Sequence, residues 1–341
     1  MRAVVYSELG DSSVLQVVER DLPTPRWGEV RVRLAVAGEN PTDWKARAGA
    51  TSSELPFDEI VPGQDGAGVV DEIGNGVSTV SVGDRVWVFL AQHGRPIGTA
   101  AEYTVVPAER VVRLGDASYD VGASLGVPAM TAHRCLTVHE DGPSRLSPDA
   151  LDGLTVLVTG GAGAVGNAAI RLAAWAGATV ITTISNDEKA RLAQAAGAHH
   201  VVNYRSGDAA AEIRALAPDG VDIVVEVAII QNADLVAKVL ATRGTVASYA
   251  NTGGTEVTLP VRTFMGLNAR LAFVLLYTVG EQALRAASED VAAAVAEGVL
   301  AVGEEHGLPL VRYPLEQTAA AHDAVENGTV GKVLIDVADL D

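Results

Sequence analysis

The sequence predicts an α/β protein in two parts, a β-rich first part and a second part built on a doubly wound parallel sheet. Three observations predict this fold class. Short runs rich in β-branched residues, separated by Gly and Pro, fill residues 1 to about 125. Strand-like and helix-like runs alternate from residue 155 onward, and a glycine-rich turn joins the first such strand to its helix. The chain of 341 residues is 48% hydrophobic, which is enough for more than one core.

The first part contains several short strand-like segments. Residues 29–34 alternate polar and apolar side chains, as a half-buried strand does. Pro23, Pro25 and Gly28 interrupt the runs, and such residues are typical of turns. We expect strands at residues 3–6, 15–18, 30–36, 68–73, 85–89 and 101–106. So many short strands at close spacing indicate a compact barrel or sandwich.

The second part alternates strands and helices. We expect strands at residues 155–159, 179–184, 200–203, 223–226 and 245–248, and helices at residues 167–176, 188–196, 209–216, 233–240 and 281–300. Right-handed crossovers place such helices on both faces of a parallel sheet. The apolar run 271–277 is either a buried last strand or an edge strand that pairs with its twin in a dimer. A final strand at residues 331–335 is expected to return to the first part.

The glycine-rich turn is the most informative stretch. Gly161, Gly163 and Gly166 have the G-x-G-x-x-G spacing, directly after a strand-like run and before an Ala-rich helix-like run. Glycine tolerates positive φ and lets a backbone come close to a pyrophosphate, and the N-terminus of a helix attracts an anion. The alternative is a tight turn without a ligand. The strand and helix on either side favour a dinucleotide site.

The residues that follow the expected strand 179–184 indicate which nicotinamide cofactor binds. NAD sites place an acidic side chain there, about 20 residues after the glycines, to bind a ribose hydroxyl. Here the strand ends in Ile184-Ser185-Asn186, with Asp187 just beyond and Lys189 in the following helix. Ser185 and Lys189 suit a 2′-phosphate, so we predict NADPH over NADH. The alternative is that Lys189 is only a solvated helix residue.

Composition limits the partners and the compartment. A net charge of −18 argues against nucleic acid and anionic membranes as partners. Cys135 is the single cysteine, so an intrachain disulfide is excluded and a reducing, cytoplasmic location is expected. The first residues lack the apolar segment of a signal peptide, and no apolar run is long enough to cross a bilayer.

Several short motifs occur together along the chain. They are MRAVV (residues 1–5), PRWGEV (25–30), NPTDWK (40–45), VPGQDGAG (61–68), VGDRV (82–86), GTAAEY (98–103) and the glycine turn. In this order and spacing the chain resembles the zinc-free quinone oxidoreductase, or zeta-crystallin-like, branch of the medium-chain dehydrogenase/reductase superfamily. The resemblance covers nearly the whole chain.

The resemblance implies a GroES-like β-barrel domain at residues 1–125, completed by about 281–341, and a Rossmann domain at residues 126–280. It also implies an NADP(H) cofactor. We expect a homodimer because of the apolar run 271–277. The cofactor-binding residues that it implies are Thr131, Gly161, Gly163, Ala164, Val165, Gly166, Ser185, Lys189, Tyr204, Tyr249, Ala250, Asn251 and Lys332.

The resemblance also implies that no metal takes part. Zinc prefers thiolate, imidazole or carboxylate ligands, but the first Cys position of the zinc-dependent relatives is Asn40 here and their His position is Gln64. We expect hydride transfer to an acceptor that is already electrophilic, with Asn40 and Gln64 as hydrogen-bond donors. Asp43 either orders this loop for catalysis or only caps a turn.

Three functions remain open from the sequence. The first is an NADPH-dependent quinone reductase that acts on a small molecule. The second is an NADPH-dependent enoyl or 2-alkenal reductase, which reduces an α,β-unsaturated carbonyl with the same cofactor. The third is a nucleotide-binding structural or RNA-associated protein, and the charge of −18 argues against RNA.

Overall fold

The computed structural model describes residues 1–340 and divides the chain into two compact units. The first unit comprises Met1–Val127 and the segment that begins at Leu310, and the second comprises Pro128–Pro309. The first boundary lies two residues beyond the expected one at 125. The return to the first unit begins at residue 310 instead of about 281, because the helix Glu281–Ala296 packs within the second unit.

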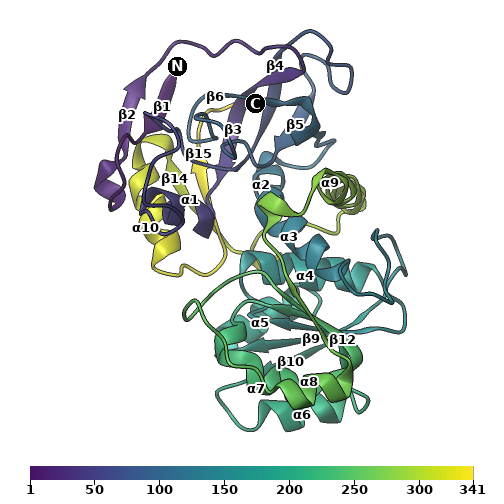
Figure 1. Ribbon diagram of the computed structural model, residues 1–341. Helices are drawn as coiled ribbons and strands as arrows, with labels where there is room; N and C mark the ends of the chain where they lie inside the picture. The colour runs from purple at the N-terminus through teal and green to yellow at the C-terminus, as the bar shows by residue number, and fades with distance from the viewer. Residues whose placement is uncertain (341) are drawn as a thin grey trace. The chain divides into compact units, whose positions relative to one another are not determined.

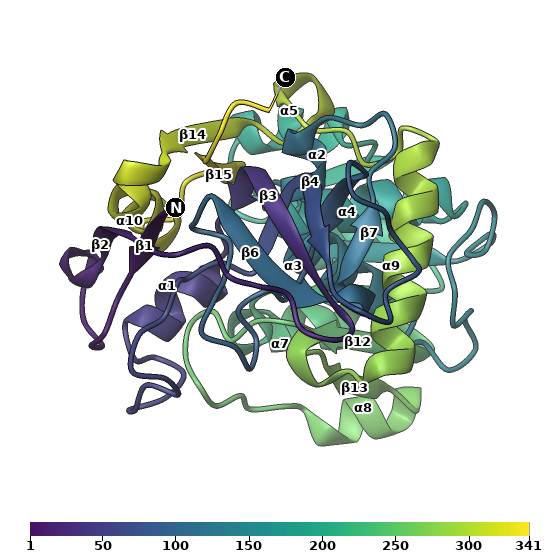
Figure 2. The same cartoon turned by 90° about the horizontal axis from the view of Figure 1, so that it is seen from above.

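The first unit is rich in short strands, as the sequence predicts, and all of its strand pairs are antiparallel except that of β14 with β15. A small sheet pairs β1 (Arg2–Val5) with β2 (Gln16–Glu19). The larger sheet has seven strands, which cross one another in Figure 2. Its order is β14 (Leu310–Pro314), β15 (Lys332–Asp336), β3 (Glu29–Gly38), β4 (Asp65–Ile73), β5 (Arg85–Val88) and β7 (Val111–Arg113), with β6 (Tyr103–Pro107) also paired to β3. The sequence analysis misses β7, whose three residues are too few to show an alternating pattern.

Helices in the first unit are short. They are η1 (Ser12–Val14), α1 (Pro41–Arg47), η2 (Ala108–Arg110), α2 (Tyr119–Ala123), η5 (Leu315–Gln317) and α10 (Thr318–Glu326). The expected return of the chain is confirmed, since β15 pairs antiparallel with β3 and places Leu334 opposite Gly38. Figure 1 shows this yellow C-terminal segment among the purple strands of the N-terminus.

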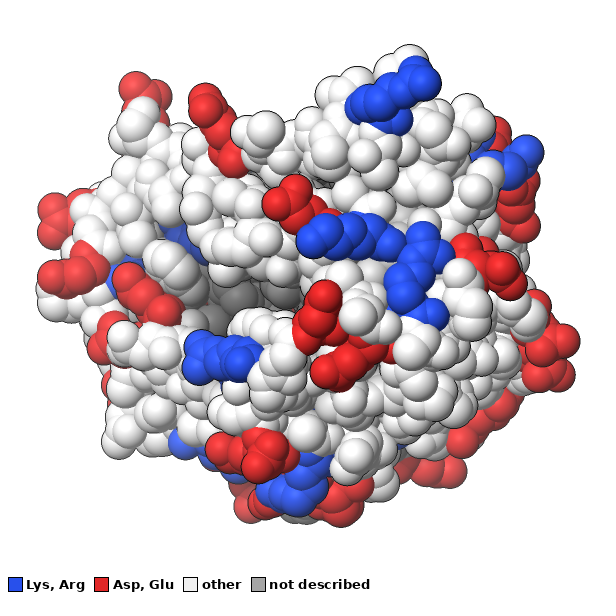
Figure 3. Space-filling model, turned by 90° about the horizontal axis from the view of Figure 1, so that it is seen from below, with Lys and Arg blue, Asp and Glu red and all other residues white. Residues whose placement is uncertain are grey.

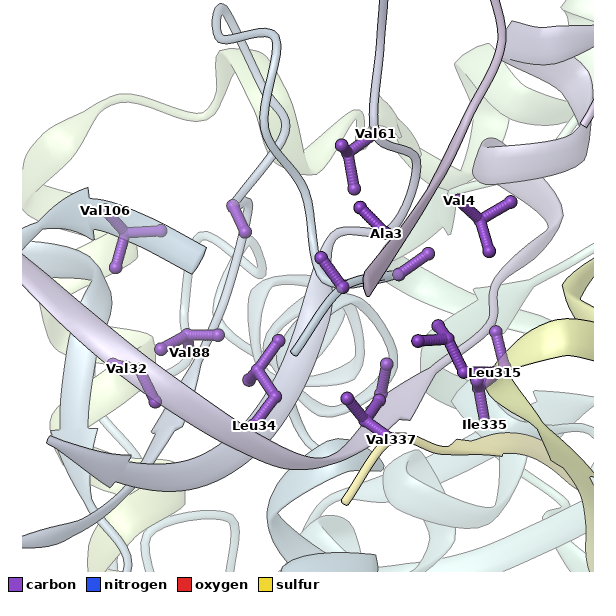
Figure 4. Packing of buried hydrophobic residues seen from close by; sticks show 14 of the residues in the cluster. Ala3, Val4, Val32, Leu34, Val61, Val88, Val106, Leu315, Ile335 and Val337 are labelled. Carbon is purple, nitrogen blue, oxygen red and sulfur yellow. The ribbon is translucent and has the colours of Figure 1, made fainter. Parts of the chain in front are cut away.

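The core of the first unit joins strands from both ends of the chain. Val32 and Leu34 of β3 are fully buried, and Ile335 of β15 is 1% exposed. Figure 4 shows these side chains turned toward Ala3, Val88 and Val106. The alternation of polar and apolar residues in β3 therefore reflects one face turned into this core.

The second unit is a doubly wound sheet of six parallel strands, as predicted. The strand order is β10 (His200–Asn203), β9 (Thr179–Ile184), β8 (Thr155–Thr159), β11 (Val221–Glu226), β12 (Leu240–Ser248) and β13 (Arg270–Phe273). Figure 1 shows α4 (Ala164–Trp175) and α5 (Asp187–Ala195) on one face, and α6 (Ala209–Leu216), α7 (Ile229–Val239) and α8 (Val261–Leu267) on the other. The order reverses between β8 and β11, where this fold binds its ligands.

The last strand differs in length from the expected run 271–277. β13 ends at Phe273, and η3 (Leu276–Thr278) follows. β13 pairs only with β12 and is the edge of the sheet, so it is not a buried last strand. The remaining elements of this unit are α9 (Glu281–Ala296), η4 (Glu304–His306) and most of α3 (Gly126–Leu136).

Surface charge and hydropathy agree with the composition. Within residues 1–340, every helix is too short or too polar to cross a bilayer. On the face shown in Figure 3, acidic side chains line much of the rim, and most basic side chains stand beside acidic ones.

A buried carboxylate fastens α9 within the second unit. Asp290 Oδ2 accepts hydrogen bonds from His133 Nε2 at 2.8 Å and the Leu146 N–H at 2.7 Å, and Oδ1 accepts from Arg145 Nε at 2.8 Å. Burial opposes ionisation, but the hydrogen bonds from His133 and Arg145 outweigh it and lower the pKa of Asp290 to about 2. This contact explains why α9 stays with the second unit.

We predict that Asp290→Ala lowers the free energy of unfolding by about 3 kcal/mol at pH 7, because His133 and Arg145 lose a buried partner. The carboxylate stabilises the fold above its unfolded pKa of about 4, and this stabilisation is lost as the pH falls toward 2. Urea unfolding at pH 7 and at pH 3 measures both effects. Glu289→Ala is the matched control, since its half-exposed side chain also contacts Arg145 and should cost less than about 1 kcal/mol. Equal losses of unfolding free energy in Asp290→Ala and Glu289→Ala would mean that the buried Asp290 carboxylate does not fasten α9.

Candidate active site

The glycine turn has the geometry that a dinucleotide needs. A Cβ on Gly161 would lie 2.1 Å from Thr182 Oγ1, and a Cβ on Gly166 would lie 2.4 Å from the Gly160 carbonyl oxygen. Packing therefore requires these two glycines. A Cβ on Gly163 would meet only the Gly160 oxygen at 3.5 Å, so Gly163 faces open space. Gly163 is also the N-cap of α4 and supplies no side chain to the free N–H groups of the first turn, which Ala164 and Val165 begin.

The residues expected to select the cofactor come together at the ends of two neighbouring strands. Ser185 follows β9 and Tyr204 follows β10, and the Tyr204 N–H donates to the Ile184 carbonyl at 3.1 Å. Lys189 lies in the first turn of α5, where its N–H donates to the Asn186 side chain at 2.9 Å. Tyr204 is half exposed. The three residues thus follow the carboxyl ends of β9 and β10, and β9 is the neighbour of β8, which leads into the glycine turn.

Glu226 is a site residue that the sequence analysis misses. It ends β11, next to β8 at the reversal of strand order, and it is fully buried. Its Oε1 accepts from Thr159 Oγ1 at 3.0 Å and from Asn232 Nδ2 at 2.9 Å, whereas Oε2 is buried without a partner. Burial raises the pKa of Glu226. Its signal in the sequence is an acidic residue that ends an otherwise apolar strand.

Four of the other residues assigned to the cofactor lie in two places of the second unit, whereas Lys332 lies in the first unit. Thr131 is on α3 and is 5% exposed. Tyr249, Ala250 and Asn251 begin the loop after β12, and the Tyr249 N–H donates to the Glu226 carbonyl at 3.1 Å. This loop is therefore fixed beside the carboxyl ends of the central strands.

The first unit carries a buried polar cluster at the end of β3. Its members are Glu39, Asn40, Asp43, Asp65 and Lys332, each less than 5% exposed. Asn40 is the N-cap of α1, where Pro41 occupies the first helical position, and the Asn40 N–H donates to Asp43 Oδ2 at 2.9 Å. Asp43 therefore does cap a turn, which is the alternative that the sequence left open.

Asn40 lies between two charged side chains of this cluster. Its Nδ2 donates to Asp65 Oδ2 at 2.8 Å and to the Gly38 carbonyl at 3.2 Å, and its Oδ1 accepts from Lys332 Nζ at 2.8 Å. Lys332 Nζ also donates to the Glu39 carbonyl at 2.9 Å. Both N–H groups of Asn40 are therefore directed at protein acceptors. In this structure Asn40 is not the free donor that the sequence analysis expects, and its remaining capacity is an oxygen lone pair.

Gln64 lies beside the cluster and has its own partner. Its Nε2 donates to Gln92 Oε1 at 3.0 Å, and Gln92 Nε2 donates to the Arg95 carbonyl at 3.1 Å. Gln64 Oε1 is buried without a partner. Gln92 thus orients the side-chain amide of Gln64, the residue that directly precedes Asp65.

Burial changes the ionisation of the cluster. It raises the pKa of Glu39 well above its usual range, and burial together with the Asp65 carboxylate raises the pKa of Asp43 to about 8. Burial also raises the pKa of Asp65, to about 6, although Lys332 opposes the rise. At neutral pH Asp65 is therefore the main anionic partner of Lys332, whose own pKa is lowered by burial. His322 of α10 faces the Glu39 carboxyl, with Nε2 at 3.3 Å from Oε1.

The cluster does not suit a metal cation. An ammonium group lies 2.8 Å from the oxygen of Asn40, and Asp65 accepts hydrogen bonds on both of its oxygens. A cation bound by Asn40 would be repelled by Lys332. Within residues 1–340, no three His, Cys, Asp or Glu side chains are grouped so that they could hold a metal ion.

Two family models match this chain, one in each unit. Residues 26–116 match the family model described as alcohol dehydrogenase GroES-like domain, and residues 164–293 match that described as zinc-binding dehydrogenase. A quinone oxidoreductase of Rattus norvegicus is 30% identical, over 98% of this chain and 97% of its own. A 2-haloacrylate reductase of a Burkholderia species is 30% identical over 98% of both chains.

Two solved structures are similar to this chain over nearly its whole length. An NAD-dependent alcohol dehydrogenase has a TM-score of 0.85 at 31% identity, over 99% of this chain and all of its own. A mycobacterial protein complexed with NADPH has a TM-score of 0.81 at 28% identity, over 98% of this chain and 99% of its own.

We predict that Asp43→Asn stabilises the protein, and more so at high pH. The asparagine side chain would keep an oxygen for the Asn40 N–H but would have no carboxyl group to ionise. The unfolded carboxyl ionises near pH 4, whereas the folded group resists ionisation up to about pH 8, so its cost rises between these pH values. The gain should be small at pH 4 and on the order of 5 kcal/mol at pH 8, because each pH unit between the two pKa values adds about 1.4 kcal/mol.

Thermal unfolding of both proteins from pH 4 to pH 8 measures this gain. Asp71→Asn, which removes a partly exposed carboxylate paired with Arg31, is the control and should stabilise at neither pH. A gain for Asp43→Asn that shrinks as the pH rises would contradict the account.

Proposed function

Because the chain belongs to the quinone oxidoreductase branch of the medium-chain dehydrogenase/reductase superfamily, we propose that this oxidoreductase transfers a hydride from NADPH to a quinone. The observation that carries the proposal is the glycine turn at the reversal of strand order, with Ser185, Lys189 and Tyr204 at the neighbouring strand ends. This arrangement suits a dinucleotide that bears a 2′-phosphate.

In this proposal the second unit holds most of the cofactor. The N–H groups at the start of α4 bind the pyrophosphate, in the space left by Gly163. Ser185, Lys189 and Tyr204 bind the 2′-phosphate. The remaining contacts, near the nicotinamide, fall to Thr131, Tyr249, Ala250, Asn251 and Lys332. The NADPH complex of the mycobacterial neighbour supports this cofactor, whereas the similarity to an NAD-dependent alcohol dehydrogenase makes cofactor preference the first property to test.

The first unit would provide the acceptor side of the reaction. Bound NADPH supplies a hydride, and the reduced acceptor then carries negative charge on oxygen. Lys332 and the oriented amides of Asn40 and Gln64 form a polar site that is fixed before the acceptor binds. Lys332 is the group that offsets the negative charge, because both side-chain N–H groups of Asn40 are already bound to Asp65 and Gly38. Positioning of the acceptor would supply much of the rate.

A second candidate is reduction of an α,β-unsaturated carbonyl. The observation that favours it is the 2-haloacrylate reductase relative, whose named substrate has a carbon–carbon double bond conjugated to a carboxylate. The acceptor then takes the hydride on carbon, but the cofactor and the polar cluster keep the same roles.

We expect the purified protein to oxidise NADPH with 9,10-phenanthrenequinone and to use NADH at least tenfold less efficiently, because Lys189 pairs with the 2′-phosphate. Absorbance at 340 nm follows the reaction for each cofactor, with 2-hexenal and 2-chloroacrylate as alternative acceptors. Turnover only with the unsaturated acceptors would favour the second candidate. An absence of NADPH oxidation with every acceptor would contradict both.

Two variants test the cofactor assignment in the same assay. Lys189→Ala should raise KM for NADPH about tenfold and leave KM for NADH within twofold, since it removes one charge-assisted contact. Lys238→Ala removes a lysine from α7 of the same unit and should change neither value. An equal rise of both Michaelis constants in Lys189→Ala would mean that Lys189 does not contact the 2′-phosphate.

We propose further that the protein is a homodimer that pairs its β13 strands. The edge of the six-stranded sheet ends in Phe273, which is 71% exposed, and Leu275 beyond it is 57% exposed. Val261 and Met265 of the adjacent α8 are each 64% exposed. An apolar sheet edge of this kind needs a cover, and a second copy offers the same edge in return.

Light scattering during gel filtration should therefore give twice the chain mass of 35.2 kDa. Phe273→Asp combined with Leu275→Asp should shift the protein to the mass of one chain, because each charge would be buried in the pair. Val82→Asp, at an exposed apolar residue of the first unit, is the control and should leave the mass unchanged. A dimeric mass for the double variant would exclude this interface.

A further inference from the structure

The side chain of Asn40 is held at both ends by charged partners. Asp65 accepts from its Nδ2, and Lys332 donates to its Oδ1, each at 2.8 Å. Asp65 and Lys332 are 0% and 1% exposed. Resting on the function proposed above, we propose that Asp65 and Lys332 are positioning residues that lock the Asn40 amide in one orientation at the acceptor site.

The charges make the orientation unambiguous. The two ends of an amide have almost the same shape, so packing alone does not distinguish them. With a carboxylate on one side and an ammonium on the other, a flipped amide would turn its oxygen toward Asp65 and its NH2 group toward Lys332. Both contacts would then be repulsive in a site without water, where unpaired charge is costly. The observed orientation is therefore the only stable one.

The backbone around the two charges leaves no space for other side chains. A Cβ on Gly126 would lie 2.0 Å from Asp65 Oδ1, and a Cβ on Gly38 would lie 1.9 Å from the Ala123 carbonyl oxygen and 3.0 Å from Lys332 Cε. Glycine at position 126 lets the carboxylate reach the Val127 N–H, at 3.0 Å from Oδ1 and 2.9 Å from Oδ2. Asp65 is thus fixed by the main chain and can in turn fix Asn40.

Stability alone does not account for this arrangement. A buried ion pair is often replaced by apolar residues at no cost in stability, because removing two charges from water offsets their attraction. Here Asp65 and Lys332 also define the direction of the Asn40 amide, which lies between them. Asn40 is also the N-cap of α1, so its main chain is fixed by the start of that helix.

A double-mutant cycle tests whether Asp65 acts through Asn40. Asn40→Ala and Asp65→Asn should each lower kcat about 10- to 100-fold, with KM for NADPH within about twofold, since a misplaced group costs rate more than binding. In the Asn40→Ala background, Asp65→Asn should have almost no further effect on kcat. Additive losses would overturn the proposal. Asp71→Asn, on the same strand β4, is the matched control and should keep the full kcat.

A charge swap separates positioning from stability. Asn40→Asp combined with Asp65→Asn keeps one carboxylate beside Lys332 and one amide beside Val127. This variant should recover the Tm that Asp65→Asn loses, but its kcat should stay low because the amide at position 40 is gone. Recovery of kcat together with Tm would mean that the cluster is only structural.

Nuclear magnetic resonance tests the orientation without any reaction. In protein labelled with 15N-asparagine, the side-chain NH2 signals of Asn40 are identified by their loss in Asn40→Ala. Asp65→Asn and Lys332→Met should each shift these signals and speed their exchange with solvent, whereas Asp71→Asn should not. Unchanged signals would overturn the proposal. If no acceptor oxidises NADPH, the proposed function fails, and the spectra alone then decide whether Asn40 is locked.

Discussion

The first unit depends on burying the Lys332 ammonium beside three carboxyl groups. Lys332 begins β15, so its position is set by the pairing of that strand with β3. Glu39 and Asn40 directly follow β3, and Asp65 begins β4. Without the returning strand, the carboxyl groups of Glu39, Asp43 and Asp65 would lie together without this cation, which would be costly in a dry interior. The return of the chain from Leu310 thus completes the fold and the candidate site together.

The second unit uses a different principle. Its candidate ligand site depends on backbone groups, because the glycines bring the main chain to the surface where α4 begins. Glu226 then joins the end of β11 to the end of β8 through Thr159, and to α7 through Asn232. An anion at such a site is bound by fixed dipoles, which need no countercharge in the core. Charge is added only at the rim, where Lys189 lies.

Local patterns in the sequence predict the second unit well and the polar cluster poorly. The glycine spacing and the apolar runs determine β8, β9, β10 and α6 to the residue, because strand, turn and helix are neighbours in the chain. One of the two charged partners of the Asn40 amide lies 292 residues away in the chain, so the sequence does not show that this amide is already bound by protein groups. Glu39, Asp65 and His322 were not recognised, since only the pairing of distant strands buries them. The position of α9 depended in the same way on one buried contact, that of Asp290 with His133.

We propose that the reaction needs no metal, and that the Lys332 ammonium and the oriented amides of Asn40 and Gln64 take the place of the zinc that the zinc-dependent relatives hold. The most direct measurement is turnover with NADPH and quinone against zinc content, determined by mass spectrometry before and after dialysis with a chelator. We expect unchanged turnover at far less than one zinc per chain, and no gain when zinc is added. Turnover that falls with the zinc content and returns with added zinc would contradict it.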